Sequence, residues 1–178
     1  MMADRSGPGG GEPVKVGLSV ALLAMMAGGP AAAQSGSDGT GVAHGFSVTD
    51  GDTVKFGGQT VRLFGIDAPE KAQSCDDGRW YPGPLATRAL IDIIAGRPVS
   101  CRWVNYGKSG LPEALCVAGE DDLGALMVSA GWAWAFTRDS DQYVDAERRA
   151  ARRGVGVHAH RCAPPWEWRT RQGIGWGR

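Results

Sequence analysis

The sequence lacks several features that would point to common classes of protein. Its 178 residues carry 19 basic and 19 acidic side chains, so the formal net charge is zero. A protein that holds nucleic acid by electrostatics alone is usually basic, and this balance argues against such a binder. It does not argue against an enzyme with a local cationic site. No internal repeat is visible, which argues against a repeat architecture.

A hydrophobic run long enough to cross a bilayer comfortably is also missing. The apolar run Val16–Met26 is too short for that. It follows Arg5 and Lys15 and precedes the small residues Ala31–Ala33, an order typical of a secretory signal. We therefore expect residues 1–33 to be a signal peptide rather than a retained anchor. The mature protein would be exported, periplasmic or secreted, without stable membrane association.

No cysteine belongs to a C-x-x-C pair, which argues against a zinc ribbon or a thioredoxin-like site. The four cysteines are an even number, and in an exported chain they predict two disulfides. Three connectivities are possible. We favour Cys101–Cys116, which would join neighbouring strands, and Cys75–Cys162, which would pin the tail to the loop after an early hairpin. The alternative is four buried free thiols.

The pattern along the chain predicts one domain of mixed α and β structure. Residues 34–41 are rich in Gly, Ser and Asp and read as a flexible linker. The domain would span 42–160, followed by a Trp- and Arg-rich tail at 161–178. We expect strands at 42–48, 53–56, 59–66, 98–104 and 114–118, and helices at 84–95, 123–130 and 141–153. Few strands with helices inserted between them suit a small closed barrel of the OB type.

Beside Asp50, which we interpret as a turn former, residues 50–70 contain three carboxylates and one arginine: Asp52, Asp67, Glu70 and Arg62. A two-residue turn at Gly57-Gly58 would pair Thr53 with Arg62 and make Asp52 the diagonal neighbour of that arginine. Asp67 and Glu70 follow shortly after the second strand. Metal-assisted phosphodiester hydrolysis needs metal ligands, a phosphate clamp and a base, and this segment carries groups suited to each role.

At these residues the chain resembles the thermonuclease family, the staphylococcal-nuclease-like domains. The resemblance rests on D-G-D-T at 50–53, V-R-L-F-G-I-D-A-P-E at 61–70 and V-S-A-G-W-A at 128–133. It covers roughly residues 42–160, and the second motif is long and specific. It implies an α+β fold with a five-stranded OB-fold β-barrel and about three helices. It also implies calcium-dependent cleavage of DNA and RNA with low sequence specificity.

The resemblance assigns a role to each residue of the site. Asp52 and Asp67 would bind Ca²⁺ with help from the Ala68 carbonyl, and calcium prefers such hard oxygen ligands. Arg62 would grip the scissile phosphate, in bidentate fashion where the geometry allows. Glu70 would activate or orient the attacking water.

One part of the family pattern is missing. The family carries a second arginine after the first helix, in a pattern like Y-G-R-x-x-A, which neutralises charge in the transition state. Here residues 105–116 read N-Y-G-K-S-G-L-P-E-A-L-C. Alignment on Tyr-Gly puts Lys108 at this position, whereas alignment on Ala114 puts Leu111 there. We favour Leu111 because that registration needs no insertion before the strand. Lys108 would then be a partial substitute, as a point charge and not a fork.

Other aromatic and basic residues have plainer interpretations. His158 and His160 have no clear third ligand nearby, so we interpret them as tail or surface residues rather than a metal site. An alternating aromatic segment favours packing over base stacking: Trp132, Trp134 and Phe136. Tryptophans and arginines of the tail either dock on the barrel or contact nucleic acid: Trp166, Trp168, Trp176, Arg169 and Arg171.

Taken together, the sequence predicts an exported, disulfide-bonded, monomeric nuclease. Its partner would be single-stranded or locally open DNA or RNA, and its cofactor would be calcium. Two alternatives stay open. The first is a catalytically weakened module that binds nucleic acid or protein, because Leu111 replaces the second arginine. The second is an exported calcium-binding structural domain.

Overall fold

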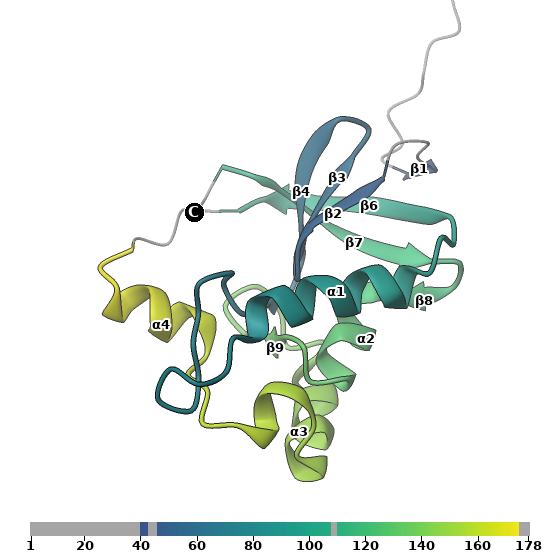
Figure 1. The fold of residues 1–178 in the computed structure, drawn as a ribbon. Coiled ribbons are helices and arrows are strands. Elements are labelled where there is room, and N and C mark those ends of the chain that lie inside the picture. Colours follow the sequence, from purple (N-terminus) through teal and green to yellow (C-terminus); the bar gives the residue numbers. More distant parts are fainter. Residues whose placement is uncertain (1–39, 43–45, 108–109, 175–178) are drawn as a thin grey trace, which may run out of the picture. The chain divides into compact units, whose positions relative to one another are not determined.

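A mixed β-sheet forms the centre of the computed structural model, which describes residues 40–42, 46–107 and 110–174 (Figure 1). Its hydrogen-bonded order is β1-β6-β7-β4-β3-β2, with β8 added to β7. The bounds are β1 (Thr40–Val42), β2 (Ser47–Asp50), β3 (Thr53–Phe56), β4 (Gln59–Leu63), β6 (Val99–Tyr106), β7 (Pro112–Ala118) and β8 (Asp121–Asp122). A second, two-stranded sheet joins β5 (Ile66–Asp67) to β9 (Trp134–Ala135).

The helices begin and end where the sequence supplies the usual signals. They are α1 (Pro82–Ile94), α2 (Leu123–Ser129), α3 (Val144–Arg153), the short 3₁₀ helix η1 (Gly156–Ala159) and α4 (Pro165–Arg171). Proline occupies the first turn of α1. The Asp122 carboxylate caps α2 by accepting the Ala125 N–H at 3.0 Å. Gly154 ends α3 in a left-handed conformation with φ of 58°.

The predicted hairpin is confirmed in its register. Thr53 pairs with Arg62 across β3 and β4. Gly57 and Gly58 make the turn with φ values of 56° and 82°, which a two-residue hairpin turn requires and glycine tolerates. The three predicted helices also appear, within a few residues of their expected bounds.

The α+β class is confirmed, but the expected closed five-stranded barrel is not. Among the described residues, β1 and β2 lie at the two ends of the hydrogen-bonded order, so the sheet path is open. The predicted strand at 42–48 is divided between β1 and β2, and residues 43–45 lie outside the described part of the chain. The tail contributes a further helix, α4, which we did not expect because its seven residues carry too short a periodic pattern.

The hydrophobic core lies between the hairpin and the helices. Val54, Val61 and Leu63 of the hairpin pack in one buried cluster with Leu90 of α1 and Met127 of α2. Figure 1 shows α1 crossing the sheet near the ends of β2, β3 and β4. Burial of these apolar side chains supplies the main driving force for folding.

Gly51 makes a close approach at this crossing. A Cβ atom there would lie 2.8 Å from the Cβ atoms of both Ala68 and Ala86, which is too close for real carbon atoms. The acidic turn can therefore sit against α1 only because residue 51 has no side chain. This contact fixes the position of Asp50 and Asp52.

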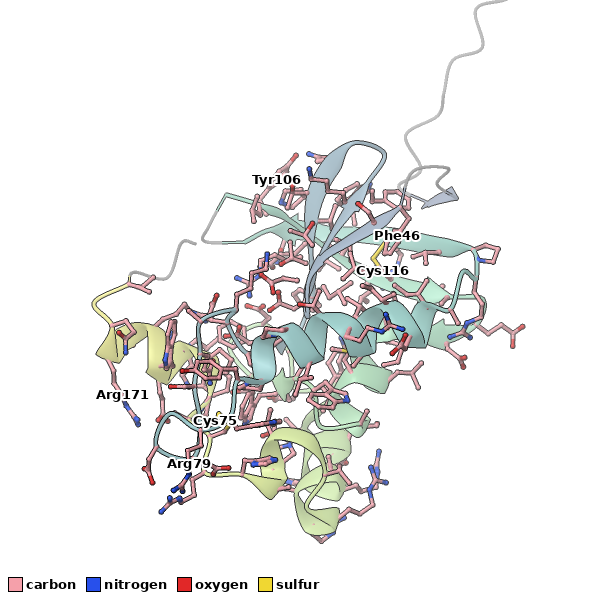
Figure 2. All side chains as sticks on the ribbon, in the orientation of Figure 1. Phe46, Cys75, Arg79, Tyr106, Cys116 and Arg171 are labelled. Carbon is pink, nitrogen blue, oxygen red and sulfur yellow. A yellow bond between two sulfur atoms is a disulfide. The ribbon has the colours of Figure 1, made fainter. Side chains whose placement is uncertain are left out.

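Both favoured disulfides are present: Cys75–Cys162 and Cys101–Cys116. Cys101 and Cys116 face each other across β6 and β7. Figure 2 labels Cys75 in the loop before α1 and Cys116 in the sheet. In the described part of the chain, no helix has the length and apolarity that crossing a membrane requires. The predicted signal peptide, most of the predicted linker and Trp176 lie outside the described residues.

Candidate active site

Asp52 stands at the entrance of the β3–β4 hairpin, where three donors fix its carboxylate. The Thr53 hydroxyl donates to Oδ1 at 2.8 Å. The Ala68 N–H donates to Oδ2 at 3.0 Å, and Arg62 Nη2 donates to the same oxygen at 3.3 Å. The bond from Ala68 ties the hairpin to the segment that carries Asp67 and Glu70. The Ala68 carbonyl, predicted as a calcium ligand, stays a prediction.

Asp67 ends β5 and is 1% exposed. Arg169 of α4 holds both of its oxygens, with Nη1 donating to Oδ1 at 3.1 Å and Nη2 donating to Oδ2 at 2.5 Å. Burial raises the pKa of Asp67 to about 6, although the hydrogen bonds from Arg169 act in the opposite direction. The carboxylate is therefore ionised at neutral pH, as an anion enclosed by protein.

Arg62 lies between the two aspartates. Its Nη2 atom is 3.3 Å from Asp52 Oδ2 and 3.5 Å from Asp67 Oδ1. The negative charge of Asp52 raises the pKa of Arg62, with a smaller contribution from Asp67, while burial lowers it. The carboxylates of Asp52 and Asp67 are thus both directed at the guanidinium of Arg62.

Asp52 and Asp67 both direct a carboxylate oxygen at Arg62, and calcium binding by these two residues stays a prediction. Carboxylate oxygens directed at one point are what Ca²⁺ binds, together with carbonyl and water oxygens. Within the described residues, no three His, Cys, Asp or Glu side chains are grouped as a metal site. An ion held by Asp52 and Asp67 would need backbone oxygens, water or substrate to complete its shell.

A pocket of about 160 Å³ opens beside these groups. Its walls include the acidic turn, the candidate phosphate clamp Arg62 and the candidate base Glu70. The full lining is Asp50, Asp52, Thr53, Arg62, Ala68, Pro69, Glu70 and Leu111. Burial, and then the nearby charge of Asp52, raise the pKa of Asp50. The structure thus brings together in one hollow the predicted residues Asp52, Arg62 and Glu70.

Leu111 occupies the wall of this pocket. It directly precedes β7, and its carbonyl accepts the Gly107 N–H at 2.9 Å in the turn between β6 and β7. Leu111 therefore faces the same hollow as Arg62 and Glu70, and its equivalence to the missing arginine stays a prediction. Lys108 lies outside the described residues.

Glu70 is held by the segment that follows it. Its backbone N–H donates to Gln73 Oε1 at 3.2 Å, and Gln73 is fully buried. Gly83 at the start of α1 packs on the Glu70 backbone so closely that a Cβ would come within 2.2 Å of the Glu70 carbonyl oxygen. Both contacts set the direction in which the Glu70 carboxylate leaves the chain.

Sequence reasoning missed two charged residues of this region. Glu113 is 7% exposed and pairs with Arg62 in the parallel β4–β7 ladder. Burial, and then the charge of Asp139, raise the pKa of Glu113, while Arg62 lowers it. The sequence did carry one indication of Glu113, since it is the one acidic residue in the otherwise apolar strand Pro112–Ala118.

The second missed residue is Arg169, whose role at the site we did not foresee. Besides Asp67, its Nη1 donates to Glu70 Oε1 at 2.6 Å, and the side chain is almost wholly buried. Burial alone lowers the pKa of Arg169, but its bonds to Asp67 and Glu70 raise it above the ordinary value. Of the two alternatives for the tail, docking on the domain is the one observed for α4.

The histidine pair takes structural positions. His160 Nδ1 lies 2.6 Å from Asp76 Oδ2, and its ring stacks on Trp80 with centroids 3.7 Å apart. His158 packs edge-on against Trp134, with ring centroids 6.0 Å apart. The two rings therefore contact different neighbours.

The sequence is similar to those of several bacterial proteins, some of which are named endonucleases. An uncharacterized endonuclease of Escherichia coli O157:H7 is 31% identical over 134 residues, which cover 70% of this chain and 82% of that protein. An uncharacterized endonuclease of Haemophilus influenzae is 30% identical over 137 residues, covering 71% and 72%. The succinoglycan biosynthesis protein ExoI of Rhizobium meliloti is 31% identical over 129 residues, covering 66% of each chain. No protein-family profile matches the chain.

Proposed function

We propose that this protein is a calcium-dependent nuclease of the thermonuclease type. The premise is that the chain belongs to the same family as the bacterial proteins named endonucleases. The protein would hydrolyse phosphodiester bonds of DNA and RNA with low sequence specificity. The observation that supports this most is the convergence of Asp52 and Asp67 on the guanidinium of Arg62, which shares a pocket with Glu70. A cation, a phosphate clamp and a base are the parts that such hydrolysis uses.

Arg62 is suited to change partners when substrate arrives. Its contacts of 3.3 and 3.5 Å with Asp52 and Asp67 are longer than the roughly 2.7–2.9 Å of strong charge-assisted bonds. A phosphate oxygen can therefore replace these carboxylates as the acceptor of the guanidinium N–H groups. Calcium, when bound by the aspartates, would offset the negative charge of the phosphate.

Glu70 would act as the general base. It lines the pocket, from where its carboxylate can accept a proton from a water molecule. The water oxygen forms the new bond to phosphorus while the bond to the leaving oxygen breaks. The leaving oxygen takes a proton from solvent, and Glu70 returns its own proton to solvent.

Leu111 limits the rate in this proposal. Its side chain carries no charge and no donor, so the phosphate receives one arginine and not two. Loss of one preorganised donor of this kind typically slows an enzyme by about 100- to 1000-fold. We therefore propose a slow nuclease, which acts on single-stranded or locally open nucleic acid.

We also propose that the protein works outside the cytoplasm, as a monomer. The two disulfides, Cys75–Cys162 and Cys101–Cys116, support the location because such bonds form and persist in oxidising compartments.

The test is cleavage of an end-labelled single-stranded DNA by the full chain in Ca²⁺ and again in excess EDTA. We expect cleavage in Ca²⁺ only, and its loss in Glu70→Gln. The matched control is Glu120→Gln, because Glu120 is exposed in the turn after β7. Absence of cleavage by folded protein in both conditions would overturn the proposal.

Leu111 also favours a second candidate, a module that binds nucleic acid without turnover. In that case Ca²⁺ would cause the DNA to be retained but not cut. A calcium-binding structural domain would differ again, since Ca²⁺ would raise the melting temperature while DNA was neither bound nor cut.

A further inference from the structure

The C-terminal helix α4 inserts an arginine among the acidic residues of the site. Arg169 is 5% exposed, and its guanidinium forms a fork with both oxygens of Asp67. The same Nη1 atom that bonds Asp67 at 3.1 Å also bonds Glu70 Oε1 at 2.6 Å. One side chain thus connects a candidate metal ligand to the candidate base.

Several contacts hold α4 in place for this. The Cys75–Cys162 disulfide joins the segment before α4 to the loop that follows Glu70. Gln73 bridges the same two segments, because its Oε1 accepts the Glu70 N–H at 3.2 Å while its Nε2 donates to the Ala163 carbonyl at 2.8 Å. Figure 1 shows α4 beside the loop that leads from β5 to α1.

The position of Arg169 excludes a role as a direct phosphate clamp. Glu70 lines the phosphate pocket and also a second hollow, whose other walls are Lys71, Ala72, Trp168, Arg169 and Ile174. Arg169 therefore approaches Glu70 from the side of α4. Its two amino groups are already engaged by buried or half-buried carboxylates.

We propose that Arg169 is a positioning residue of the nuclease site: it fixes the carboxylates of Asp67 and Glu70 in the orientation that cation binding and proton transfer require. This inference rests on the proposed function. The planar guanidinium of Arg169 binds both oxygens of Asp67 and so fixes the plane of that carboxylate. Its bond to Glu70 Oε1 fixes the position of Glu70 relative to Asp67. Partners of this kind behind a metal ligand typically account for about 10- to 100-fold in metal affinity or activity.

The test combines calcium affinity with steady-state cleavage of single-stranded DNA by the full chain. For Arg169→Ala, we expect a Kd for Ca²⁺ alone, measured by calorimetry, to rise about 10-fold, and kcat to fall about 10- to 100-fold. KM for DNA should stay nearly constant because Arg169 does not line the phosphate pocket. Arg169→Lys should lie between wild type and alanine, since it restores the charge but not the fork.

Arg171 gives a matched control on the same helix. It is exposed and pairs with Glu167 across one turn at 3.1 Å, and Figure 2 shows its side chain directed away from the fold. Arg171→Ala should therefore leave both Kd and kcat at wild-type values. A merely structural role of Arg169 would lower the melting temperature without changing either quantity in the folded protein.

The outcomes separate this inference from the proposed function. Tighter calcium binding or faster cleavage by Arg169→Ala would overturn it, because Arg169 would then block the site. Unchanged Kd and kcat in folded Arg169→Ala would overturn it as well, while a cleaving wild type left the proposed function intact. A wild type that neither binds Ca²⁺ nor cleaves would overturn both.

Arg169→Lys keeps the inference testable if Arg169→Ala does not fold. It retains a positive charge beside Asp67 and Glu70 but loses the fork. We expect it to weaken calcium binding and to lower kcat relative to wild type, by less than the loss expected for alanine. Wild-type values of both quantities in folded Arg169→Lys would overturn the inference.

Discussion

Leu111 and Arg169 lie on two sides of the site and differ in the charge that they bring to it. Leu111 lines the phosphate side but offers no charge, whereas Arg169 brings a charge that is committed to Asp67 and Glu70. Among the described residues, the pocket wall carries three carboxylates, Asp50, Asp52 and Glu70, and Arg62 is the one arginine that lines it.

Replacing Leu111 by arginine should restore the missing donor. We expect Leu111→Arg to raise kcat by about 100-fold, since a preorganised cationic donor contributes on that order in the transition state. Single-turnover cleavage of single-stranded DNA in Ca²⁺ measures this. Leu111→Met is the matched control, because it keeps an apolar side chain of similar size and should change little. An unchanged rate in Leu111→Arg would mean that another group already serves the leaving oxygen.

Individual residues of the site were predictable where short-range rules apply. The pairing of Thr53 with Arg62 followed from the two-glycine turn, and it put Asp52 beside that arginine. Arg169 was not predictable as a site residue, because 102 residues separate it from Asp67. No local periodicity or turn rule fixes a contact over such a separation.

Gly51 shows how one backbone position controls the acidic turn as an element. In Gly51→Ala, the new methyl would lie 2.8 Å from the Cβ atoms of Ala68 and Ala86. We expect a loss of about 1–3 kcal/mol in the free energy of unfolding, the usual cost of overpacking, and reduced cleavage as the turn moves. Chemical denaturation and a cleavage assay well below the melting temperature measure the two effects.

Gly57→Ala is the comparison for this prediction. A Cβ there meets no atom within 4 Å, although φ is +56°. It should cost about 1 kcal/mol through turn strain and leave cleavage unchanged. Equal loss of activity in both variants would mean that the contacts of Gly51 do not fix the site.

The segment before α4 has an anchor that depends on pH. The bond from His160 lowers the pKa of Asp76, and the Arg161 N–H, which donates to Asp76 at 2.8 Å, lowers it further. Because the folded protein then binds this proton less tightly than the unfolded chain, the carboxylate stabilises the fold above its ordinary pKa. This stabilisation is lost as pH falls through the lowered pKa of the folded state.

We expect Asp76→Asn to lower the melting temperature at pH 5–7, with the difference from wild type shrinking as pH falls below about 4. Thermal denaturation of both proteins between pH 2.5 and 7 measures this. Asp145→Asn is a suitable control, because Asp145 forms an exposed ion pair with Arg148 on α3. A difference that did not depend on pH would contradict the role of the charge.

For the molecule as a whole, the two disulfides should differ in how much they contribute to the free energy of unfolding. Cys75–Cys162 spans 87 residues and Cys101–Cys116 spans 15. Loop-closure entropy gives about 4–5 kcal/mol for a bridge near 100 residues and about 3 kcal/mol for one of 15. We expect the serine pair at 75 and 162 to lose more free energy of unfolding in urea than the serine pair at 101 and 116. The reverse order would show that packing in the sheet outweighs chain entropy.

The global arrangement could be predicted only in part. Helix signals such as Asp122 and Gly154 act locally, and the helices they bound appear as expected. Closure of the sheet depends instead on how distant strands meet. The parallel pairing of Arg62 with Glu113 and the position of β1 beside β6 follow from tertiary packing, which the hydrophobic pattern of each strand does not encode.

The covalent link at Cys162 and the position of Arg169 have a consequence for synthesis. A ribosome makes Asp52, Arg62, Asp67 and Glu70 early, but Arg169, the bidentate partner of Asp67, follows 102 residues later, beyond the second cysteine of the long bridge. A nascent chain that has not reached residue 169 therefore carries these acidic residues without that partner. If Arg169 positions the carboxylates as proposed, the site is complete only after synthesis has passed residue 169 and the Cys75–Cys162 bridge has formed.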